Sequence, residues 1–361
     1  MAAPDRALAL ALWPWLQVRS RPSLVRRALT GLDYPEGQPP ALPRVRVGVV
    51  QFNLNLALSA ADFARHVHGL VRQAVAGGAG LVIFPEYTSL PLLGLLPGAG
   101  RLARALEARA ASPAAGDDEG GYRVMALALR LAAPAARRVY AATFSTLAAR
   151  FRVTILAGSL IEPGPGGRLY NVAHLFGPGG ERLARQVKTH LVPSEVVMGY
   201  GVGVQIEVVD TLAGRLAFPV CMDHTYFETA RIAGLCGADL LIDPAANNEY
   251  YNAYAQARGV WNRVQEVPAY GVLCCGVGRV AGTVFQGRSG VYAPLAMTAG
   301  GDGVVAEAKT FDREEVVLAD LDYQALAAFR RRHPLEFNLD LYRRYLPGAY
   351  AHDPRPAPRI M

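Results

Sequence analysis

The eight residues "AGLVIFPE", Ala79 to Glu86, decide the class of fold. Their apolar run is typical of a strand covered on both faces, as in parallel sheets. Upstream, "VRVGVVQFN" (Val45 to Asn53) is rich in β-branched residues and predicts another strand. Between them, "SAADFARHVHGLVRQAVAGG" has a serine cap, apolar residues at helical spacing and a glycine stop. Strand, helix and strand in this order predict a βαβ unit.

The same alternation continues along the chain. The segment "RLYNVAHLFGPGGERLARQVK" predicts a hairpin that turns at residues 178–180. Residues 88–120 contain glycine and proline and are expected to be an irregular functional loop or insertion. Helices outside a mixed sheet architecture are expected, with further strands at 153–160, 204–210, 214–220, 238–243, 269–277, 283–285, 290–292, 304–306 and 316–321, and helices at 122–150, 226–236, 252–267 and 322–332.

Length and composition set the domain organisation. The chain has 361 residues and is 52% hydrophobic, which suits one large α/β domain with extensions, or two domains. Residues 1–44 are rich in arginine, proline and alanine and are expected to form an extension or linker. The domain itself is expected over residues 45–332, followed by a tail over 333–361.

The sequence lacks the patterns typical of membrane spans, export signals and nucleic-acid binding. No apolar run approaches the ~20 residues that cross a bilayer, and the longest, Ala7 to Leu16, contains Pro14. Asp5 offsets Arg6 at the start of the chain, so we expect a short helix, no export signal and a cytoplasmic protein. The net charge is +7, but the basic residues are scattered and no nucleic-acid-binding motif is recognised, so no nucleic-acid partner is expected.

The cysteines and lysines limit which kinds of site the chain can be expected to contain. Cys221, Cys236, Cys274 and Cys275 show no zinc-site spacing, so no metal site is expected, and in a reducing compartment no disulfide either. The last three are interpreted as small core residues. Of 37 basic residues only two are lysine, Lys188 and Lys309, which suggests that a retained lysine serves as an amine.

Three reactive side chains follow apolar runs: Glu86 in "VIFPEY", Lys188 in "RQVKTH" and Cys221 in "FPVCMDH". Active sites of open α/β sheets lie at the carboxyl ends of strands, so these side chains could converge. A thiolate attacks an acyl carbon, a neighbouring carboxylate moves the proton, and an ammonium stabilises the oxyanion. Each residue alone has an ordinary structural interpretation, and their joint order favours a catalytic triad.

This constellation resembles the nitrilase superfamily of carbon–nitrogen hydrolases, whose triad is Glu, Lys and Cys. The resemblance spans about Val45 to Leu321 and includes the "FPE" motif, the glycine-rich hairpin and the steps Cys221, Asp223, Tyr226, Glu228 and Arg231. It implies an α-β-β-α sandwich of two mixed β-sheets with outer helices, and homodimers or larger assemblies. It also implies hydrolysis of an amide or related C–N bond through a cysteine thioester, without metal or organic cofactor.

The resemblance also suggests further site residues. Glu195, seven residues after Lys188, matches a second glutamate of many members that binds the lysine and lines the pocket. The backbone N–H of Met222 is the expected second oxyanion donor. Further candidate pocket residues are Tyr87, His224, Asn247 and Asn248.

Four residues depart from the family pattern, so the resemblance does not predict the substrate pocket. Phe227 stands where a proline is common, Met222 and His224 replace the usual neighbours of the cysteine, and Asp243 stands where asparagine or an apolar residue is frequent.

Three alternatives remain open from the sequence alone. The same triad could hydrolyse a nitrile or transfer an acyl group. The chain could be a catalytically silent scaffold of the same fold, although the intact triad argues against this. A Cys–His dyad using His190 or His224 is the third alternative, and no spacing favours it.

Overall fold

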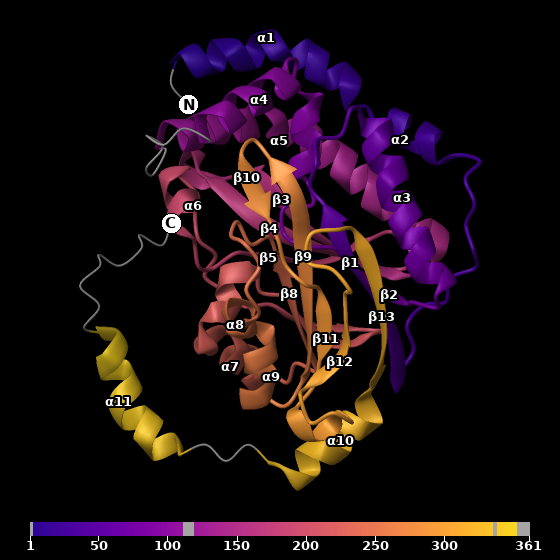
Figure 1. Ribbon diagram of the computed structural model, residues 1–361, viewed down its shortest axis with the longest axis vertical. Helices are drawn as coiled ribbons and strands as arrows, with labels where there is room; N and C mark the ends of the chain where they lie inside the picture. Colours follow the sequence, from indigo (N-terminus) through magenta and orange to yellow (C-terminus); the bar gives the residue numbers. More distant parts are fainter. Residues whose placement is uncertain (1–2, 111–118, 335–337, 352–361) are drawn as a thin grey trace.

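The structure is a computed structural model that describes residues 3–110, 119–334 and 338–351 (Figure 1). Its strands are β1 (Arg44–Asn53), β2 (Leu81–Ile83), β3 (Thr154–Pro163), β4 (Leu169–Phe176), β5 (Arg182–Val187), β6 (Val208–Thr211), β7 (Gly214–Ala217), β8 (Leu240–Ala245), β9 (Tyr270–Val280), β10 (Thr283–Phe285), β11 (Gly290–Tyr292), β12 (Val304–Glu307) and β13 (Glu315–Asp322). Its α-helices are α1 (Ala3–Arg19), α2 (Pro22–Leu29), α3 (Ala60–Ala76), α4 (Ala99–Ala110), α5 (Glu119–Phe151), α6 (Pro193–Val197), α7 (Phe227–Leu235), α8 (Ala253–Ala257), α9 (Val260–Glu266), α10 (Tyr323–Arg332) and α11 (Leu339–Ala351). The 3-10 helices are η1 (Leu90–Leu95), η2 (Pro165–Gly167), η3 (Cys221–Thr225) and η4 (Leu295–Met297).

The strands form two mixed sheets. In the first the order is β5-β4-β3-β2-β1-β13, with β2 parallel to β1 and β3 and the other pairs antiparallel. In the second, β6-β7-β8-β9 continues to β11 and β12, and β10 pairs with the far end of β9. A short parallel contact between the ends of β1 and β9, Phe52 with Gly276 and Asn53 with Val277, joins the sheets.

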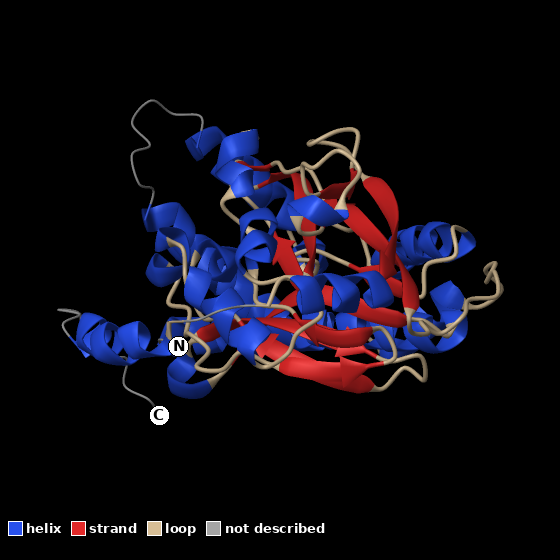
Figure 2. Ribbon diagram, turned by 90° about the horizontal axis from the view of Figure 1, so that it is seen from below, coloured by secondary structure: helices blue, strands red, loops and turns tan. Residues whose placement is uncertain are grey.

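Alternation along the strands sorts the side chains into layers. On β1, Val47 and Val49 face the core between the sheets, whereas Val50 and Phe52 face a second core beneath α2, α3 and α5. On the second sheet, Ile242 points into the core between the sheets, and its neighbour Leu241 packs in a third core that includes residues of α7 and α9. Helices therefore cover both outer faces of the strands (Figures 1 and 2). The expected α-β-β-α sandwich is confirmed.

The opening βαβ unit has the predicted form. Ser59 caps α3 by accepting a hydrogen bond from the Asp62 N–H. The helix then lies so close to β1 that a Cβ on Gly48 would stand 2.7 Å from the Cβ of Ala74. Only glycine therefore allows this approach of helix to strand.

Two predicted boundaries are wrong. The segment 88–120 is not irregular throughout, because η1 and α4 occupy much of it and Leu92 and Leu95 are fully buried; residues 111–118 lie outside the described ranges. The helix expected over 252–267 divides into α8 and α9, because Gly259 has ψ −141°, outside the helical region.

The cysteines divide differently from the prediction. Cys274 and Cys275 are buried in β9, as expected. Cys236 is exposed, because α7 ends at Leu235 and leaves this residue as its C-cap. The prediction that Cys236 is a core residue is therefore wrong. All four thiols are free.

The first two helices pack on the body of the protein. α1 and α2 lie against α5 (Figure 1), and Val25 and Leu29 of α2 are fully buried in the core beneath α3 and α5. Leu16 of α1 reaches the same core. Among the described helices, none combines the length and apolarity that a bilayer crossing requires.

This packing predicts that α2 contributes to stability. Leu29→Ala should lower the free energy of unfolding by about 2–5 kcal/mol, because it leaves a cavity in a close-packed core. Leu10→Ala is the matched control, since that side chain is 74% exposed, and it should change the value by less than about 0.5 kcal/mol. Urea denaturation of the full chain measures both. Equal, small effects would contradict a structural role for α2.

Candidate active site

Three connections bring the predicted triad to one place. Glu86 follows β2, Lys188 follows β5, and Cys221 opens η3 shortly after β7. The first two side chains meet directly, with Lys188 Nζ 2.8 Å from Glu86 Oε1. Cys221 interacts electrostatically with both, and its hydrogen bond with Glu86 is one of the influences on that carboxyl.

Lys188 is a buried ammonium group held by two carboxylates. Its side chain is 1% exposed, and Nζ lies 2.9 Å from Glu195 Oε1 in addition to its contact with Glu86. Burial favours a lower pKa for Lys188, but the charges of Glu86 and Glu195 outweigh it, so the pKa is raised well above its ordinary value. The lysine is therefore fixed as a cation inside the protein.

Glu86 receives two further hydrogen bonds that the sequence did not reveal. Asn171 on β4 donates its amide to Oε1 at 2.8 Å, and the Ala246 backbone N–H donates to Oε2 at 3.0 Å. Burial raises the pKa of Glu86, although the charge of Lys188 opposes the rise. An asparagine at the start of the largely apolar strand segment "NVAHLF" was the available signal for Asn171. Nothing in the sequence marks the Ala246 backbone N–H.

The second glutamate, Glu195, stands where the resemblance placed it. It is fully buried, and its Oε1 accepts a 2.6 Å hydrogen bond from the Tyr87 hydroxyl as well as binding Lys188. Its Oε2 accepts from the Val192 backbone N–H at 3.0 Å. Tyr87 itself has φ +58°, and its backbone N–H donates to Ser159 Oγ at 2.8 Å. Tyr87 therefore holds Glu195 in place by a hydrogen bond, and Glu195 in turn binds the ammonium group of Lys188.

Cys221 sits on a strained elbow. Its φ is +51°, in the left-handed region that non-glycine residues rarely adopt. The side chain is partly exposed, and Sγ lies 4.0 Å from Asn247 Oδ1. Burial and the charge of Glu86 raise the pKa of the thiol well above its ordinary value, while Lys188 lowers it. The resting sulfur is therefore a thiol at neutral pH.

Asp223 links the segment that carries Cys221 to the segment that carries Lys188. Its carboxylate is fully buried and accepts hydrogen bonds from the Thr189 and His190 backbone N–H groups at 3.0 and 2.6 Å, and from the Val220 N–H at 2.9 Å. Thr189 also donates its hydroxyl at 2.8 Å. One carboxylate thus joins the residue after Lys188 to the residue before Cys221. Backbone N–H groups thus supply most of the hydrogen bonds that Asp223 accepts.

The remaining candidate pocket residues differ in how deeply they are buried. His224 is fully buried, and Nε2 lies 3.0 Å from the Ile242 carbonyl on β8, so its ring belongs to the interior beneath the elbow. Met222 and Asn247 are partly exposed beside Cys221, and Asn248 is exposed.

The structure offers no support for a Cys–His dyad. His190 stacks on Tyr226 with 4.1 Å between ring centroids and contacts Asp223, and His224 contacts Ile242. Within the described ranges, no hydrogen bond joins either histidine to the Cys221 thiol. The same residues contain no group of three or more His, Cys, Asp or Glu side chains able to hold a metal ion.

His224 predicts a specific pH dependence of stability. Burial lowers its pKa to about 4 from an ordinary value of 6.5, so the unfolded chain takes up a proton at a higher pH than the folded protein does. The stabilising effect is complete above pH 6.5 and is lost as the pH falls toward 4. When the pH falls from 7 to 5, the wild type should lose about 2 kcal/mol more unfolding free energy than the His224→Gln variant does. Urea denaturation at the two pH values measures this difference. The same loss in both proteins would contradict a neutral buried His224.

Known proteins share this sequence pattern. The sequence model of the family "Carbon-nitrogen hydrolase" matches residues 46–331. A probable hydrolase of Bacillus subtilis, YhcX, is 28% identical over 298 residues, which cover 80% of this chain and 52% of the relative. A chloroplastic omega-amidase of Arabidopsis thaliana is 27% identical over 317 residues, with 82% and 74% covered. The chain thus spans about half the length of the first relative.

Solved structures share the fold. Nit3 of Saccharomyces cerevisiae, described as a member of branch 10 of the nitrilase superfamily, has a TM-score of 0.58 at 18% identity, covering 84% of this chain and 99% of that chain. A mutant of an amidase from Nesterenkonia sp. AN1, solved in complex with butyramide, has a TM-score of 0.57 at 19% identity, with 83% and 97% covered. These similarities confirm the sandwich fold.

Proposed function

Because this chain belongs to the carbon-nitrogen hydrolase family, we propose that it hydrolyses the C–N bond of a small, non-peptide amide through a thioester on Cys221, releasing ammonia or an amine. The resemblance to the nitrilase superfamily is confirmed. The observation that carries the proposal is the buried cluster of Lys188, Glu86 and Glu195 beside the thiol. Relatives named omega-amidase and deaminated glutathione amidase support an amide as the substrate.

In the first half of the proposed reaction, Cys221 forms the covalent bond. Glu86 takes the thiol proton as the sulfur attacks the carbonyl carbon, and the carbonyl π electrons move to oxygen. A base with a raised pKa suits this task, and burial raises the pKa of Glu86. Lys188 and the Met222 backbone N–H stabilise the oxyanion. Glu86 then gives its proton to the leaving nitrogen, the C–N bond breaks, and a thioester remains.

In the second half, water replaces the amine. Glu86 takes a proton from water as the water oxygen attacks the thioester carbon, and the same two donors stabilise the second oxyanion. The C–S bond then breaks, the sulfur recovers its proton from Glu86, and a carboxylic acid leaves. Glu195 acts here as a positioning residue, because it contacts Lys188 and Tyr87. Tyr87, Asn247 and Asn248 complete the proposed pocket surroundings.

The family resemblance also supports a homodimer or larger homo-oligomer. A cytoplasmic location stays the expectation drawn from the start of the sequence. A small amide is the proposed substrate, and ammonia release from amides, nitriles, ureido acids and ω-amido acids is the screen that identifies its class.

The nucleophile provides the direct test. Cys221→Ala should abolish ammonia release on the best substrate of that screen while the protein stays folded, because losing an essential nucleophile costs many orders of magnitude in kcat. Cys236→Ala is the matched control, since that thiol is exposed at the end of α7. Intact mass should show one adduct of an acylating probe on the wild type and on the control, and none on Cys221→Ala. Unchanged kcat in Cys221→Ala would refute the proposal.

The two lysines provide a second test. Lys188→Arg should lower kcat by about 10²-fold or more, because the planar guanidinium is bulkier than an ammonium and directs its donors differently. Lys309→Arg should leave kcat within error, since Lys309 is exposed between β12 and β13. Melting curves of both variants separate a catalytic effect from unfolding. Equal activity of the two folded variants would remove Lys188 from the mechanism.

A further inference from the structure

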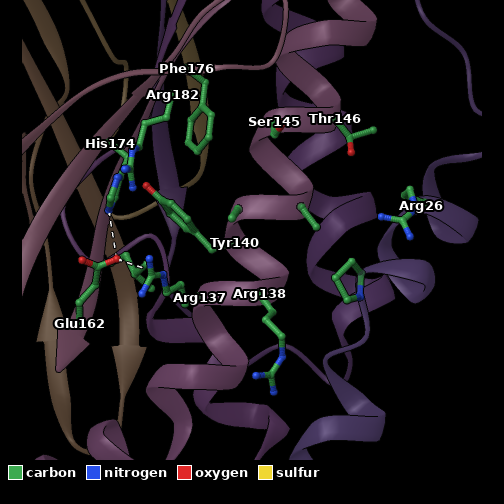
Figure 3. A pocket seen from close by; sticks show the side chains of 14 residues that line it. Arg26, Arg137, Arg138, Tyr140, Ser145, Thr146, Glu162, His174, Phe176 and Arg182 are labelled. Carbon is green, nitrogen blue, oxygen red and sulfur yellow. Dashed lines mark ion pairs between the residues drawn. The ribbon is translucent and has the colours of Figure 1, made fainter.

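A groove of about 640 Å³ crosses the outer surface of α5, and its lining includes none of the active-site residues described above. Figure 3 shows Arg26 of α2 on one side of α5, and Arg182, His174 and Phe176 of the β4–β5 hairpin on the other. Arg137 and Arg138 project from α5 itself. Three separate parts of the fold therefore bring basic side chains to one hollow.

The charge of this groove is unbalanced. Four guanidinium groups line it, and the carboxylate among its lining residues, Glu162, is already engaged: Oε1 lies 3.7 Å from Arg137 Nε and 3.5 Å from His174 Nε2. Among the described residues, Arg26, Arg138 and Arg182 have no carboxylate within 4.0 Å.

Some arginines elsewhere on the surface are paired with acids. Arg46 pairs with Asp320 at 2.6 Å, and Arg215 pairs with Asp210 at 2.7 Å. Arg138 instead donates to the neutral Ser20 hydroxyl, at 2.7 Å from its Nη2. Guanidinium groups repel one another, so four of them around one hollow with a single carboxylate leave an excess of positive charge that a bound anion would balance.

The remaining lining is suited to an organic molecule. Tyr140 and Phe176 are buried aromatic residues whose ring centroids lie 6.4 Å apart, and Ala142 and Ser145 keep the α5 surface low between the two basic sides. The volume falls in the range of small-molecule sites, roughly 300–1,000 Å³. The hydroxyl of Ser145 donates to the Gly180 carbonyl, which holds the hairpin turn against α5.

We propose that this groove binds a small organic anion with at least two negative charges, either phosphorylated or polycarboxylic. Arg26 and Arg182 contact its charged groups from opposite sides, because a guanidinium presents paired donors that match phosphate and carboxylate oxygens. The apolar part of the ligand lies over Ala142 and Phe176. Binding at this groove is independent of the thioester chemistry proposed for Cys221.

Isothermal titration calorimetry of the full-length protein, at fixed ionic strength, tests this site. Inorganic pyrophosphate and citrate are the two probes, which distinguish a phosphate from a polycarboxylate ligand, and added NaCl is the charge-screening control. At least one probe should bind saturably with one site per chain. Arg26→Gln and Arg182→Gln should each weaken that binding about tenfold, the lower end for a charged hydrogen bond. Arg313→Gln, an exposed arginine outside the groove, should leave it unchanged.

Three results would overturn the proposal. The first is the absence of saturable binding of either probe. The second is equal affinity in the Arg26 and Arg182 variants and the wild type, or an equal loss in Arg313→Gln, since either would indicate non-specific attraction to a basic protein. The third is sedimentation of the ligand-free protein as an oligomer that Arg182→Gln dissociates, because a second copy of the chain would then occupy the groove.

Discussion

The burial of one ammonium group, on Lys188, dictates the arrangement around it. A charge removed from water costs several kcal/mol unless partners replace its hydration. Here the partners come from distant parts of the chain: Glu86 after β2, Glu195 at the start of α6, and Asn171 on β4, which contacts both carboxylates. The ammonium group is therefore compensated only when the strands of the first sheet are paired in the correct register. A fault in any of these strands would leave a buried ion uncompensated.

The second constraint acts through the backbone. The left-handed conformation of Cys221 persists only where the surroundings hold it. Asp223 supplies that hold, because it binds the Val220 N–H on one side and the Thr189 and His190 N–H groups on the other. Cys221 and Lys188 are thus positioned by one carboxylate. A displacement of either loop would displace the other, which couples the geometry of the proposed nucleophile to that of the proposed oxyanion donor.

The sequence predicted the site residues that follow strands. It did not predict the contacts that depend on how strands are placed together, or the residues at which helices begin and end. Glu86, Lys188 and Cys221 each follow an apolar run, and the sheet topology brings such ends together. The donors to Glu86 could not be predicted, because Asn171 on β4 and Ala246 just after β8 approach it only once both sheets are assembled. The α4 helix was missed because glycine and proline before it outweighed its helical spacing. Cys236 was misplaced because α7 ends one residue earlier than predicted.

The two carboxylates around one ammonium explain how a single glutamate could move protons in the proposed reaction. Glu195 accepts hydrogen bonds from the Tyr87 hydroxyl, the Val192 backbone N–H and the Lys188 ammonium. One ammonium between two carboxylates leaves a surplus negative charge. The pKa of Glu86 is raised mainly by its burial and also by the charge of Glu195. When Glu86 takes the thiol proton, the negative charge passes to the substrate oxygen. The total charge beside Lys188 then stays constant through the reaction, so no additional charge has to be buried in the low-dielectric site.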